Sequence, residues 1–423
     1  MSDRPLGMTP RLTWPEDDGN GVLGDGRFAS VTHHPKSVDE LRSIVQSAVA
    51  SGLAIYPQGG GTSLGYGGIP NRPGVAVRLG RIARVIDYPF ADMTVTVEAG
   101  MTLSALRALL ARQGQRVAIE AAHPDAATLG GIYATASTGP RRFGWGRPRD
   151  QIIGVSFVAG DGELVRGGGR VVKNVAGYDF PKLLTGSLGT LGIITELTLK
   201  VSPRPEASAV ILVVFDSLSA ARAALDQLNV SGTRPIALEL IDDYLPDGPP
   251  RGGQWSLMVG FEGNRAAVEW QVRRLESELG RTELNVLRDH EAETVWLSIV
   301  DHEAGEGGPL GFSSSFAPSR VIEFLARVDP EAWSIRVHAG NGVVRGVARS
   351  DGDLETWASE VERLRAEASR LGGSLVLPRC PTSWKGRLNV WGPPRPDWTI
   401  AEKVKLALDP GRVLNPGRFI GTI

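Results

Sequence analysis

The stretch Ile55-Tyr56-Pro57-Gln58-Gly59-Gly60-Gly61-Thr62-Ser63-Leu64-Gly65-Tyr66-Gly67-Gly68 decides how this chain is interpreted. A short apolar segment enters three consecutive glycines, and two hydroxyl side chains follow. Because glycine lacks a Cβ atom, successive backbone N–H groups in such a loop turn toward one point. A concave row of N–H groups binds anions such as phosphate. The stretch therefore predicts a loop that wraps a diphosphate, and a glycine-rich surface turn without a ligand is the alternative.

Two familiar nucleotide-binding loops do not fit this stretch. A P-loop ends in Gly-Lys-Ser/Thr, with the lysine on the phosphates, whereas Thr62 and Ser63 follow the glycines here. A Rossmann fingerprint opens directly into a helix whose N-terminus faces the pyrophosphate. More glycines, Pro70 and Pro73 follow Ser63 and disfavour a helix. The rest of the chain must therefore identify the cofactor to which the diphosphate belongs.

Composition narrows the class of protein. The 423 residues are enough for two or three domains. A formal net charge of -1 gives no electrostatic argument for nucleic acid. Cys380 is the single cysteine, which excludes an intrachain disulfide and an iron–sulfur cluster held by this chain alone. No run reaches the roughly 18 apolar residues of a membrane span, and the N-terminal residues lack an apolar signal core. We therefore expect a cytoplasmic protein without a transmembrane segment; attachment to the inner face of the membrane through partners is the alternative.

Helices and strands alternate along the chain. Ser37 and Glu40 make a capping-box pattern that starts a helix ending near Gly52. Before Pro203 the patterns predict strands over 55–57, 75–79, 85–88 and 94–99, a helix over 102–113, and a hairpin over 152–159 and 163–166. Beyond Pro203 they predict strands over 210–215, 237–241, 256–261, 333–338, 343–348 and 374–377, and helices over 217–228, 266–279, 318–328, 353–371 and 397–408. The chain is therefore expected to be α+β.

Two later stretches also consist largely of small residues. One runs from Pro124 to Pro140, and the other, Gly186 to Gly192, precedes a strand. Small side chains let a ligand or another backbone approach closely, and a tight helix–sheet contact is the alternative. Together with the first loop, they favour a large, flat, phosphorylated cofactor. Four arginines follow the first of these stretches and suit phosphate recognition, a solvated basic turn being the alternative: Arg141, Arg142, Arg147 and Arg149.

Four stretches together resemble a known family: Pro57 to Gly68, Thr128 to Arg142, Arg170 to Gly192, and Asp409 to Phe419. The last two are the most specific. The chain resembles the FAD-binding subunits of glycolate oxidase (glycolate dehydrogenase) complexes, within the vanillyl-alcohol-oxidase or PCMH-type family of flavoproteins. This resemblance implies a PCMH-type FAD-binding domain of two α+β subdomains over 1–204, an α+β cap domain with an antiparallel sheet over 205–396, and a segment over 397–423 that returns to the FAD-binding domain.

The resemblance also implies which residues hold FAD. They are Pro57, Gln58, Gly59, Gly60, Gly61, Thr62, Ser63, Gly68, Pro124, Thr128, Leu129, Gly130, Gly131, Ala134, Thr138, Gly139, Arg142, Gly189, Gly192, Ile193, Ile194 and Asn415. In relatives that bond FAD covalently, a histidine often ends the first loop. Thr62 stands there in this chain, and the loops contain no cysteine, so non-covalent FAD is expected.

The histidines do not predict a metal site. His290 and His302 flank a helical pattern, and a continuous helix would place them roughly 18 Å apart along its axis. The stretch from His338 to Arg345 resembles the motif with which catalytic relatives bind a metal beside a 2-hydroxy-acid substrate. Its later histidine is missing, and His338 alone cannot supply a three-ligand site. We therefore expect no metal.

Three residues are candidates for a catalytic role. Arg379 and Lys385 match the family and, if they face a flavin, would bind a carboxylate substrate or stabilise reduced flavin. An exposed basic edge is the alternative for these two residues. His338 is the third candidate for a catalytic role.

The resemblance implies an FAD-dependent oxidoreductase subunit of a glycolate or D-2-hydroxy-acid dehydrogenase complex. A second FAD-binding subunit would dehydrogenate the small hydroxy-acid substrate. An iron–sulfur subunit would accept the electrons, because Cys380 alone cannot ligate a cluster. The alternatives are a stand-alone FAD-dependent oxidoreductase acting on another small alcohol or hydroxy acid, and a structural subunit that has lost FAD.

Overall fold

A small parallel sheet carries the glycine stretch. The computed structural model describes residues 21–169, 177–242, 255–280, 284–304 and 308–423. In it β4 (Ala54–Gln58) and β3 (Thr32–His33) flank β5 (Gly74–Arg78), and both pairings are parallel. Helix α1 (Val38–Ala50) begins where the Ser37 hydroxyl accepts a hydrogen bond from the Glu40 backbone N–H, and it buries Leu41 and Val45 against the sheet. Residues 59–73 form turns and no helix, as their glycines and prolines predict.

A five-stranded antiparallel sheet forms the second layer of this region. Its order is β10 (Leu164–Gly168), β9 (Ile152–Val158), β11 (Ile193–Lys200), β7 (Thr94–Glu98) and β6 (Val85–Asp87). Helices α2 (Leu103–Ala111) and α3 (Leu129–Thr135) pack on it through Leu103, Leu106, Leu129 and Ile132. The hairpin of β9 and β10 matches the prediction, and residues 170–176 of the specific stretch 170–192 lie outside the described residues.

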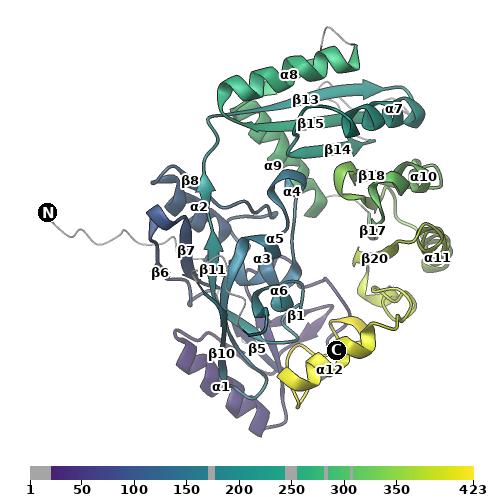
Figure 1. The fold of residues 1–423 in the computed structure, drawn as a ribbon. Coiled ribbons are helices and arrows are strands. Elements are labelled where there is room, and N and C mark those ends of the chain that lie inside the picture. Colours follow the sequence, from purple (N-terminus) through teal and green to yellow (C-terminus); the bar gives the residue numbers. More distant parts are fainter. Residues whose placement is uncertain (1–20, 170–176, 243–254, 281–283, 305–307) are drawn as a thin grey trace, which may run out of the picture.

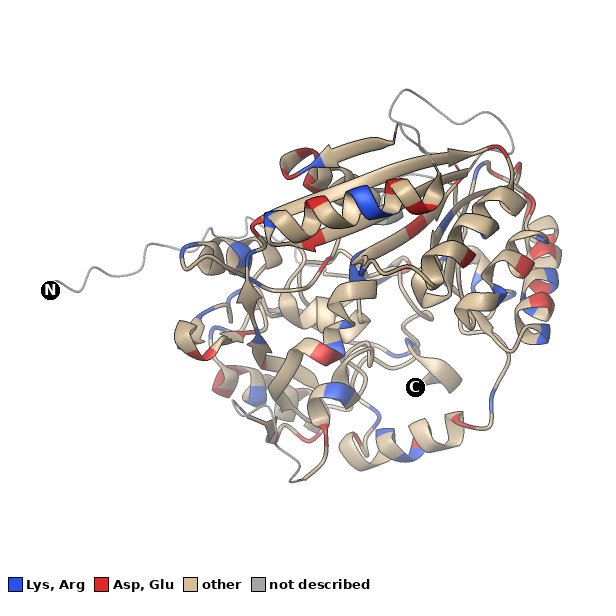
Figure 2. Cartoon of the chain, turned by 45° about the horizontal axis from the view of Figure 1, so that its top comes forward, with Lys and Arg blue, Asp and Glu red and all other residues tan. Residues whose placement is uncertain are grey.

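An eight-stranded antiparallel sheet follows in the chain, and we call residues 207–379 the cap (Figure 1). Its order is β16 (Asn285–Arg288), β13 (Ala207–Phe215), β15 (Trp255–Gly263), β14 (Ala237–Ile241), β18 (Trp333–His338), β19 (Val343–Ala348), β17 (Gly311–Ser315) and β20 (Ser374–Arg379). The helices α7 (Leu218–Asn229), α8 (Arg265–Leu279), α10 (Val321–Leu325) and α11 (Leu354–Arg370) cover one face. Acidic and basic residues are interspersed on the outer helices (Figure 2).

The other face of the cap sheet is buried as well. Helix α9 (His290–Ala304) packs there through Val295, Trp296 and Ile299. Alternate residues of β13 therefore enter two different cores: Ile211 joins the cluster under the outer helices, and Val210 joins the cluster under α9. Burial on both faces explains why this strand reads as a continuous apolar run rather than as an alternation.

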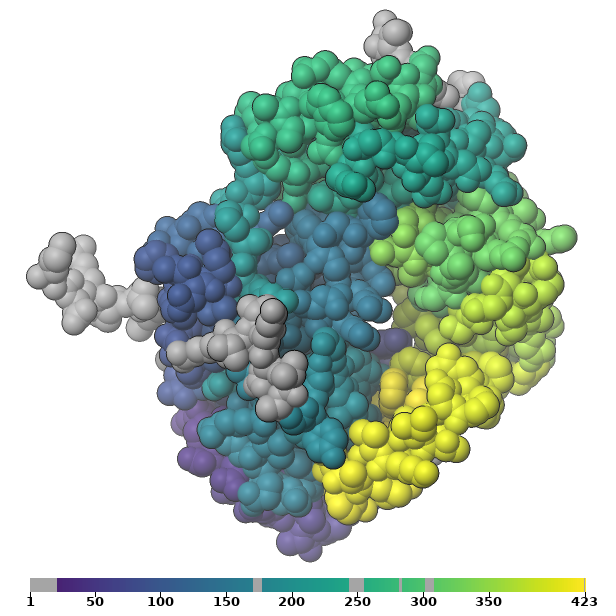
Figure 3. Space-filling model, in the orientation of Figure 1, coloured from purple at the N-terminus to yellow at the C-terminus, as the bar shows by residue number. Residues whose placement is uncertain are grey.

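The C-terminal segment returns to the glycine stretch. After α12 (Trp398–Leu408), the backbone N–H of Ile55 donates to the Val413 carbonyl at 2.7 Å, and that of Asn415 donates to the Ile55 carbonyl at 2.8 Å. This pairing adds the segment to the parallel sheet beside β4. The space-filling view shows the segment, in yellow, against the surface of the N-terminal region (Figure 3).

The predicted α+β class with an antiparallel cap sheet is confirmed. The predicted helix over 318–328 is shorter in the structure, which has a 3-10 turn over Pro318–Arg320 and then α10. Strand β17 was not predicted, because its sequence Gly311-Phe-Ser-Ser-Ser315 has no apolar alternation although Ser314 is fully buried.

Candidate cofactor site

A cavity of about 210 Å³ lies where the small-residue loops meet. The glycine loop supplies one wall, residues between 121 and 137 a second, residues between 188 and 194 a third, and Asn415 and Arg418 close it from the C-terminal segment. None of the described residues of the cap belongs to this lining. Segments that are far apart in the sequence, all outside residues 207–379, therefore build one site.

The first wall requires glycine at two adjacent positions. A Cβ atom on Gly59 would lie 2.0 Å from the Thr128 hydroxyl, and one on Gly60 would lie 1.7 Å from the Ala126 carbonyl oxygen. Gly61 has a φ of +74°, which disfavours other residue types. The glycine loop therefore lies directly against the second wall, and no larger residue fits at Gly59 or Gly60 unless one of the two segments moves.

The second wall is formed around α3, the helix of the second small-residue stretch. Thr128 caps this helix by accepting a hydrogen bond from the Gly131 backbone N–H at 3.3 Å. On its other side, the Gly130 backbone N–H donates to the Ala99 carbonyl at 2.8 Å, and a Cβ on Gly130 would lie 3.0 Å from the Ala99 Cβ. The small residues thus serve both roles weighed for them: a tight helix–sheet contact and a cavity wall.

The third wall is tied to the other two. Gly189 has a φ of +69°, and a Cβ there would lie 2.9 Å from the Pro57 ring. A Cβ on Gly192 would lie 2.4 Å from the ring of Phe157. The Asn415 side-chain amide donates to the Leu188 carbonyl at 2.6 Å and so fixes the C-terminal segment to this loop.

Most residues predicted to hold the cofactor line this cavity. They are Pro57, Gln58, Gly59, Gly60, Gly61, Thr62, Ser63, Thr128, Gly130, Gly131, Ala134, Gly189, Gly192, Ile193, Ile194 and Asn415. The lining does not include Gly68, Pro124 and Leu129. Thr138, Gly139 and Arg142 line a second, much smaller void instead.

Sequence reasoning missed several residues of the lining, among them Tyr66, His123, Ser137 and Arg418. Tyr66 packs on Trp391 with ring centroids 5.3 Å apart, and burial raises the pKa of its hydroxyl. Arg418 forms an ion pair with Asp25 at 2.7 Å. It also donates to the carbonyl oxygens of Gly68 and Leu64, so its guanidinium serves the protein rather than a ligand. The signal that could have revealed Arg418 is its place in the C-terminal stretch 409–419, which resembles the family.

The two basic catalytic candidates lie elsewhere. The Lys385 ammonium contacts an Asp25 carboxylate oxygen at 2.7 Å and the carbonyl oxygens of Gly65 and Gly67 at 2.7 and 2.8 Å. Neither of the sequence interpretations, a group facing the flavin or an exposed basic edge, describes it, because this buried lysine is a strut beneath the glycine loop. Arg379 donates to the Gly308 carbonyl at 3.4 Å and does not line the cavity.

His338 is buried between the cap and the region below it. Its Nδ1 atom lies 2.8 Å from both carboxyl oxygens of Glu239, its cross-strand neighbour on β14. Burial lowers the pKa of His338 to about 3 and raises the pKa of Glu239 well above its ordinary value. The glycines after His338 serve packing: a Cβ on Gly340 would lie 2.5 Å from the ring of Phe143.

The residues of this motif do not fit the metal of the catalytic relatives. Within the described residues, no group of three His, Cys, Asp or Glu side chains lies close enough to hold a metal ion. His290 begins the continuous helix α9, as its apolar pattern predicted.

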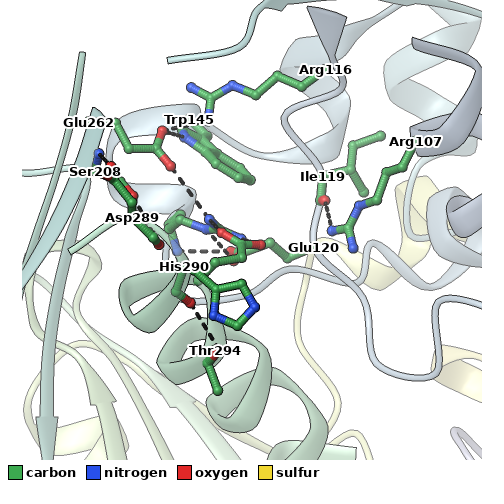
Figure 4. Close-up of polar contacts among 12 residues, drawn as sticks. Arg107, Arg116, Ile119, Glu120, Trp145, Ser208, Glu262, Asp289, His290 and Thr294 are labelled. Atoms are coloured by element: carbon green, nitrogen blue, oxygen red, sulfur yellow. Dashed lines mark hydrogen bonds and ion pairs between the residues drawn. The ribbon is translucent and has the colours of Figure 1, made fainter. Parts of the chain in front are cut away.

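The expected role of the arginines after α3 is wrong for Arg141. It is neither exposed nor directed at the cavity, because 3% of its side chain is exposed and carboxylates surround it. Its Nε atom donates to Glu120 at 2.7 Å, and its Nη1 and Nη2 atoms donate to Glu293 at 2.5 and 3.1 Å. Figure 4 shows Glu120 with its surroundings, including Glu262 and Trp145.

Comparisons with known proteins agree with this site. The family described as FAD binding domain matches residues 29–168, and the family described as the C-terminal domain of FAD linked oxidases matches residues 204–299. A D-2-hydroxyglutarate dehydrogenase from Xanthomonas citri pv. viticola is 36% identical over 92% of this chain and 88% of its own length. Glycolate oxidase subunit GlcE from Escherichia coli is 41% identical over 29% of this chain and 36% of its own length.

A solved structure shares the fold. Alkyldihydroxyacetonephosphate synthase superposes on 93% of this chain and 78% of its own chain with a TM-score of 0.67 and 19% sequence identity. At that identity the likeness concerns architecture alone. No helix among the described residues has the length and apolarity needed to cross a membrane.

Proposed function

This chain belongs to the FAD-linked oxidoreductases of the glycolate oxidase and D-2-hydroxy-acid dehydrogenase family, and from that premise we propose that it is the flavoprotein subunit of a dehydrogenase complex that oxidises glycolate or a related small D-2-hydroxy acid. In this proposal, residues 1–204 with 397–423 hold FAD, and residues 205–396 cover it. Its cofactor is FAD, which accepts a hydride equivalent from a substrate and can release electrons singly.

The observation that carries the proposal is the cavity wall at Gly59 and Gly60. Both glycines line the cavity, and both pack so closely on Thr128 and Ala126 that no Cβ fits there. A glycine loop of this kind suits an anion held by successive backbone N–H groups. The Thr62 and Ser63 hydroxyls would donate to the same diphosphate. Gly189 and Gly192 would lay backbone against a flat ring, and Asn415 would hold that loop in place.

We propose that FAD is bound without a covalent link. Thr62 stands where covalently linked relatives carry a histidine, and the single cysteine, Cys380, is absent from the lining. His123 does line the cavity, so the proposal needs a direct test. Acid precipitation of the protein should release the yellow flavin into the supernatant, whereas a covalent link would leave it in the pellet.

The proposed complex contains two further subunits. A chain with one cysteine cannot ligate a cluster, so an iron–sulfur subunit would receive the electrons. His338 is engaged with Glu239 in a motif that does not fit the metal of the catalytic relatives. A second FAD-binding subunit would therefore perform the metal-assisted dehydrogenation.

Purification of the tagged chain from its native host tests this function. We expect a second flavoprotein and a cysteine-rich chain to purify with it, and dye-linked oxidation of glycolate to require all three. The likeness to D-2-hydroxyglutarate dehydrogenase along most of the chain favours a second candidate, a dehydrogenase that acts alone. Dye reduction by the isolated chain at the rate of the complex would establish that candidate and remove the first.

A further inference from the structure

The ion cluster around Arg141 joins the cap to the cavity wall, although it lies outside the cavity. Arg141 and Glu120 belong to the region below the cap and form an ion pair at 2.7 Å. Glu262 lies on β15 and Glu293 on α9, both in the cap, and their carboxylates approach the Arg141 guanidinium at 3.5 and 2.5 Å. One buried guanidinium thus holds carboxylates from both sides of the junction.

A second contact set reinforces the same junction. Arg116, from below the cap, donates to Glu262 at 2.5 Å, and the Trp145 indole N–H donates to it at 3.1 Å. Arg141 and Arg116 both pack on the Trp145 ring, at 4.3 and 4.7 Å from its centroid. Figure 4 shows the Glu262 carboxylate beside the Trp145 ring, with Arg116 next to them. Hydrogen-bonded, desolvated charge pairs of this kind are costly to break from one side.

Both ends of the Arg141–Glu120 pair continue directly into the cavity wall. Glu120 is followed by Ala121, Ala122 and His123, which line the cavity. On the Arg141 side, Ser137 lines the cavity and also the small void that contains Glu120. Gly139 lies between Ser137 and Arg141 in the sequence, and a Cβ on it would lie 2.7 Å from a Glu120 carboxyl oxygen. The segments that contain Glu120 and Gly139 are therefore in close contact. A shift of the cluster therefore displaces two strips of the cavity wall.

We propose that Arg141 is a positioning residue that couples the docking of the cap to the occupancy of the FAD cavity. FAD orders the strips 121–123 and 134–137, and these hold Glu120 and Arg141 where Glu262 and Glu293 of the cap can engage them. By thermodynamic reciprocity, engagement of the cap tightens FAD binding by the same factor. The inference rests on the FAD cavity of the proposed function, and it assigns no contact between Arg141 and FAD.

Titration of the flavin-stripped full chain with FAD, followed by flavin fluorescence, tests the coupling. Glu293→Gln changes only a half-buried cap residue, and Arg141→Lys keeps the charge but loses the paired donors. Each should weaken FAD binding about fivefold or more, the usual lower range of coupling between two sites. Arg288→Ala, which removes a surface ion pair with Glu269 inside the cap, should bind FAD as the wild type does.

A second measurement separates coupling from a purely structural role. FAD should raise the Tm of the wild type and slow hydrogen exchange in α9, and Glu293→Gln should lose part of both effects. If FAD binds equally tightly to the wild type, Glu293→Gln and Arg141→Lys, and raises their Tm equally, the coupling is wrong while the cavity assignment stands. If the wild type binds no FAD at all, both the cavity assignment and the coupling are wrong.

Discussion

The Lys385 ammonium lies 2.7 Å from the Gly65 carbonyl oxygen and 2.8 Å from that of Gly67. The same ammonium contacts Asp25 at 2.7 Å, and both charged side chains are almost fully buried. A residue that follows the cap in sequence therefore fixes the curvature of the glycine loop from beneath.

Replacement of Lys385 should weaken FAD binding and stability rather than act directly on the oxidation step. Lys385→Met removes one partner of a buried ion pair, so we expect a loss of about 3–5 kcal/mol in unfolding free energy, reduced where Arg418 retains Asp25, together with weaker FAD binding. Thermal unfolding and flavin titration measure the two effects. The exposed Lys403→Met is the matched control. If Lys385→Met kept full FAD affinity but lost oxidation activity, Lys385 would have the substrate-binding role instead.

Two glycines of one loop should respond oppositely to alanine. Gly60→Ala places a Cβ 1.7 Å from the Ala126 carbonyl oxygen, so the loop must move and FAD content after purification should fall to near zero. A Cβ on Gly65 meets nothing within 4 Å, so Gly65→Ala should retain FAD. Absorbance of the bound flavin measures both, and equal FAD content in the two variants would contradict the assigned wall.

The buried pair of Lys405 and Asp409 should be essential for the C-terminal segment. Both side chains are fully buried, 2.6 Å apart, and Lys405 also donates to the Thr190 and Leu414 carbonyl oxygens. Lys405→Met leaves the Asp409 carboxylate buried without its counter-ion, which costs about 3–5 kcal/mol. Denaturant unfolding should show that Lys405→Met with Asp409→Asn loses less than the two single changes summed, and strict additivity would refute a direct pair.

The junction between the cap and the region below it should weaken in acid. Burial alone would raise the pKa of Glu293, but the Arg141 hydrogen bond and the charges of Arg141, Arg107 and Arg116 bring that pKa below its ordinary value of 4.5. A carboxyl with a lowered pKa in the folded state stabilises that state above about pH 4.5, and the contribution is lost as pH falls further.

Hydrogen exchange of α9 measured between pH 6 and 4 checks this dependence. Glu120 and Glu262 also face Arg141, so Glu293 is one of three carboxylates at the cluster. Glu293→Gln should therefore flatten the profile in part. A profile identical to that of the wild type would exclude Glu293 as a source of the pH dependence.

Local patterns predicted the elements that local physics determines. The cap of α1 at Ser37, the turns after Gly61 and the apolar run of β13 each follow from residues adjacent in sequence. The cavity walls at Gly59, Gly130 and Gly189 were predicted because runs of small residues can be recognised in the sequence. Their meeting in one cavity required the resemblance, since nothing in their spacing fixes the tertiary arrangement.

Ion pairs between residues that are far apart in the chain could not be recognised in the sequence. Arg141 was interpreted as a phosphate ligand or a solvated arginine because its cap partners, Glu262 and Glu293, are more than a hundred residues away. Both sequence interpretations of Lys385, a group facing the flavin and an exposed basic edge, missed its partners for the same reason, since they lie near residues 25 and 65. The order of the cap strands, with β17 between β19 and β20, also depends on non-local packing.

The pairing of Ile55 with the residues around Leu414 has a consequence for biosynthesis. The ribosome releases the glycine loop early, but the segment around Leu414 that pairs with Ile55, and the Asn415 amide, emerge only after the whole cap has been translated. The cavity of the nascent chain therefore stays incomplete during most of translation, and FAD can bind fully only when synthesis is nearly finished. A premature stop anywhere in the cap should yield a polypeptide that contains the glycine loop and carries no flavin.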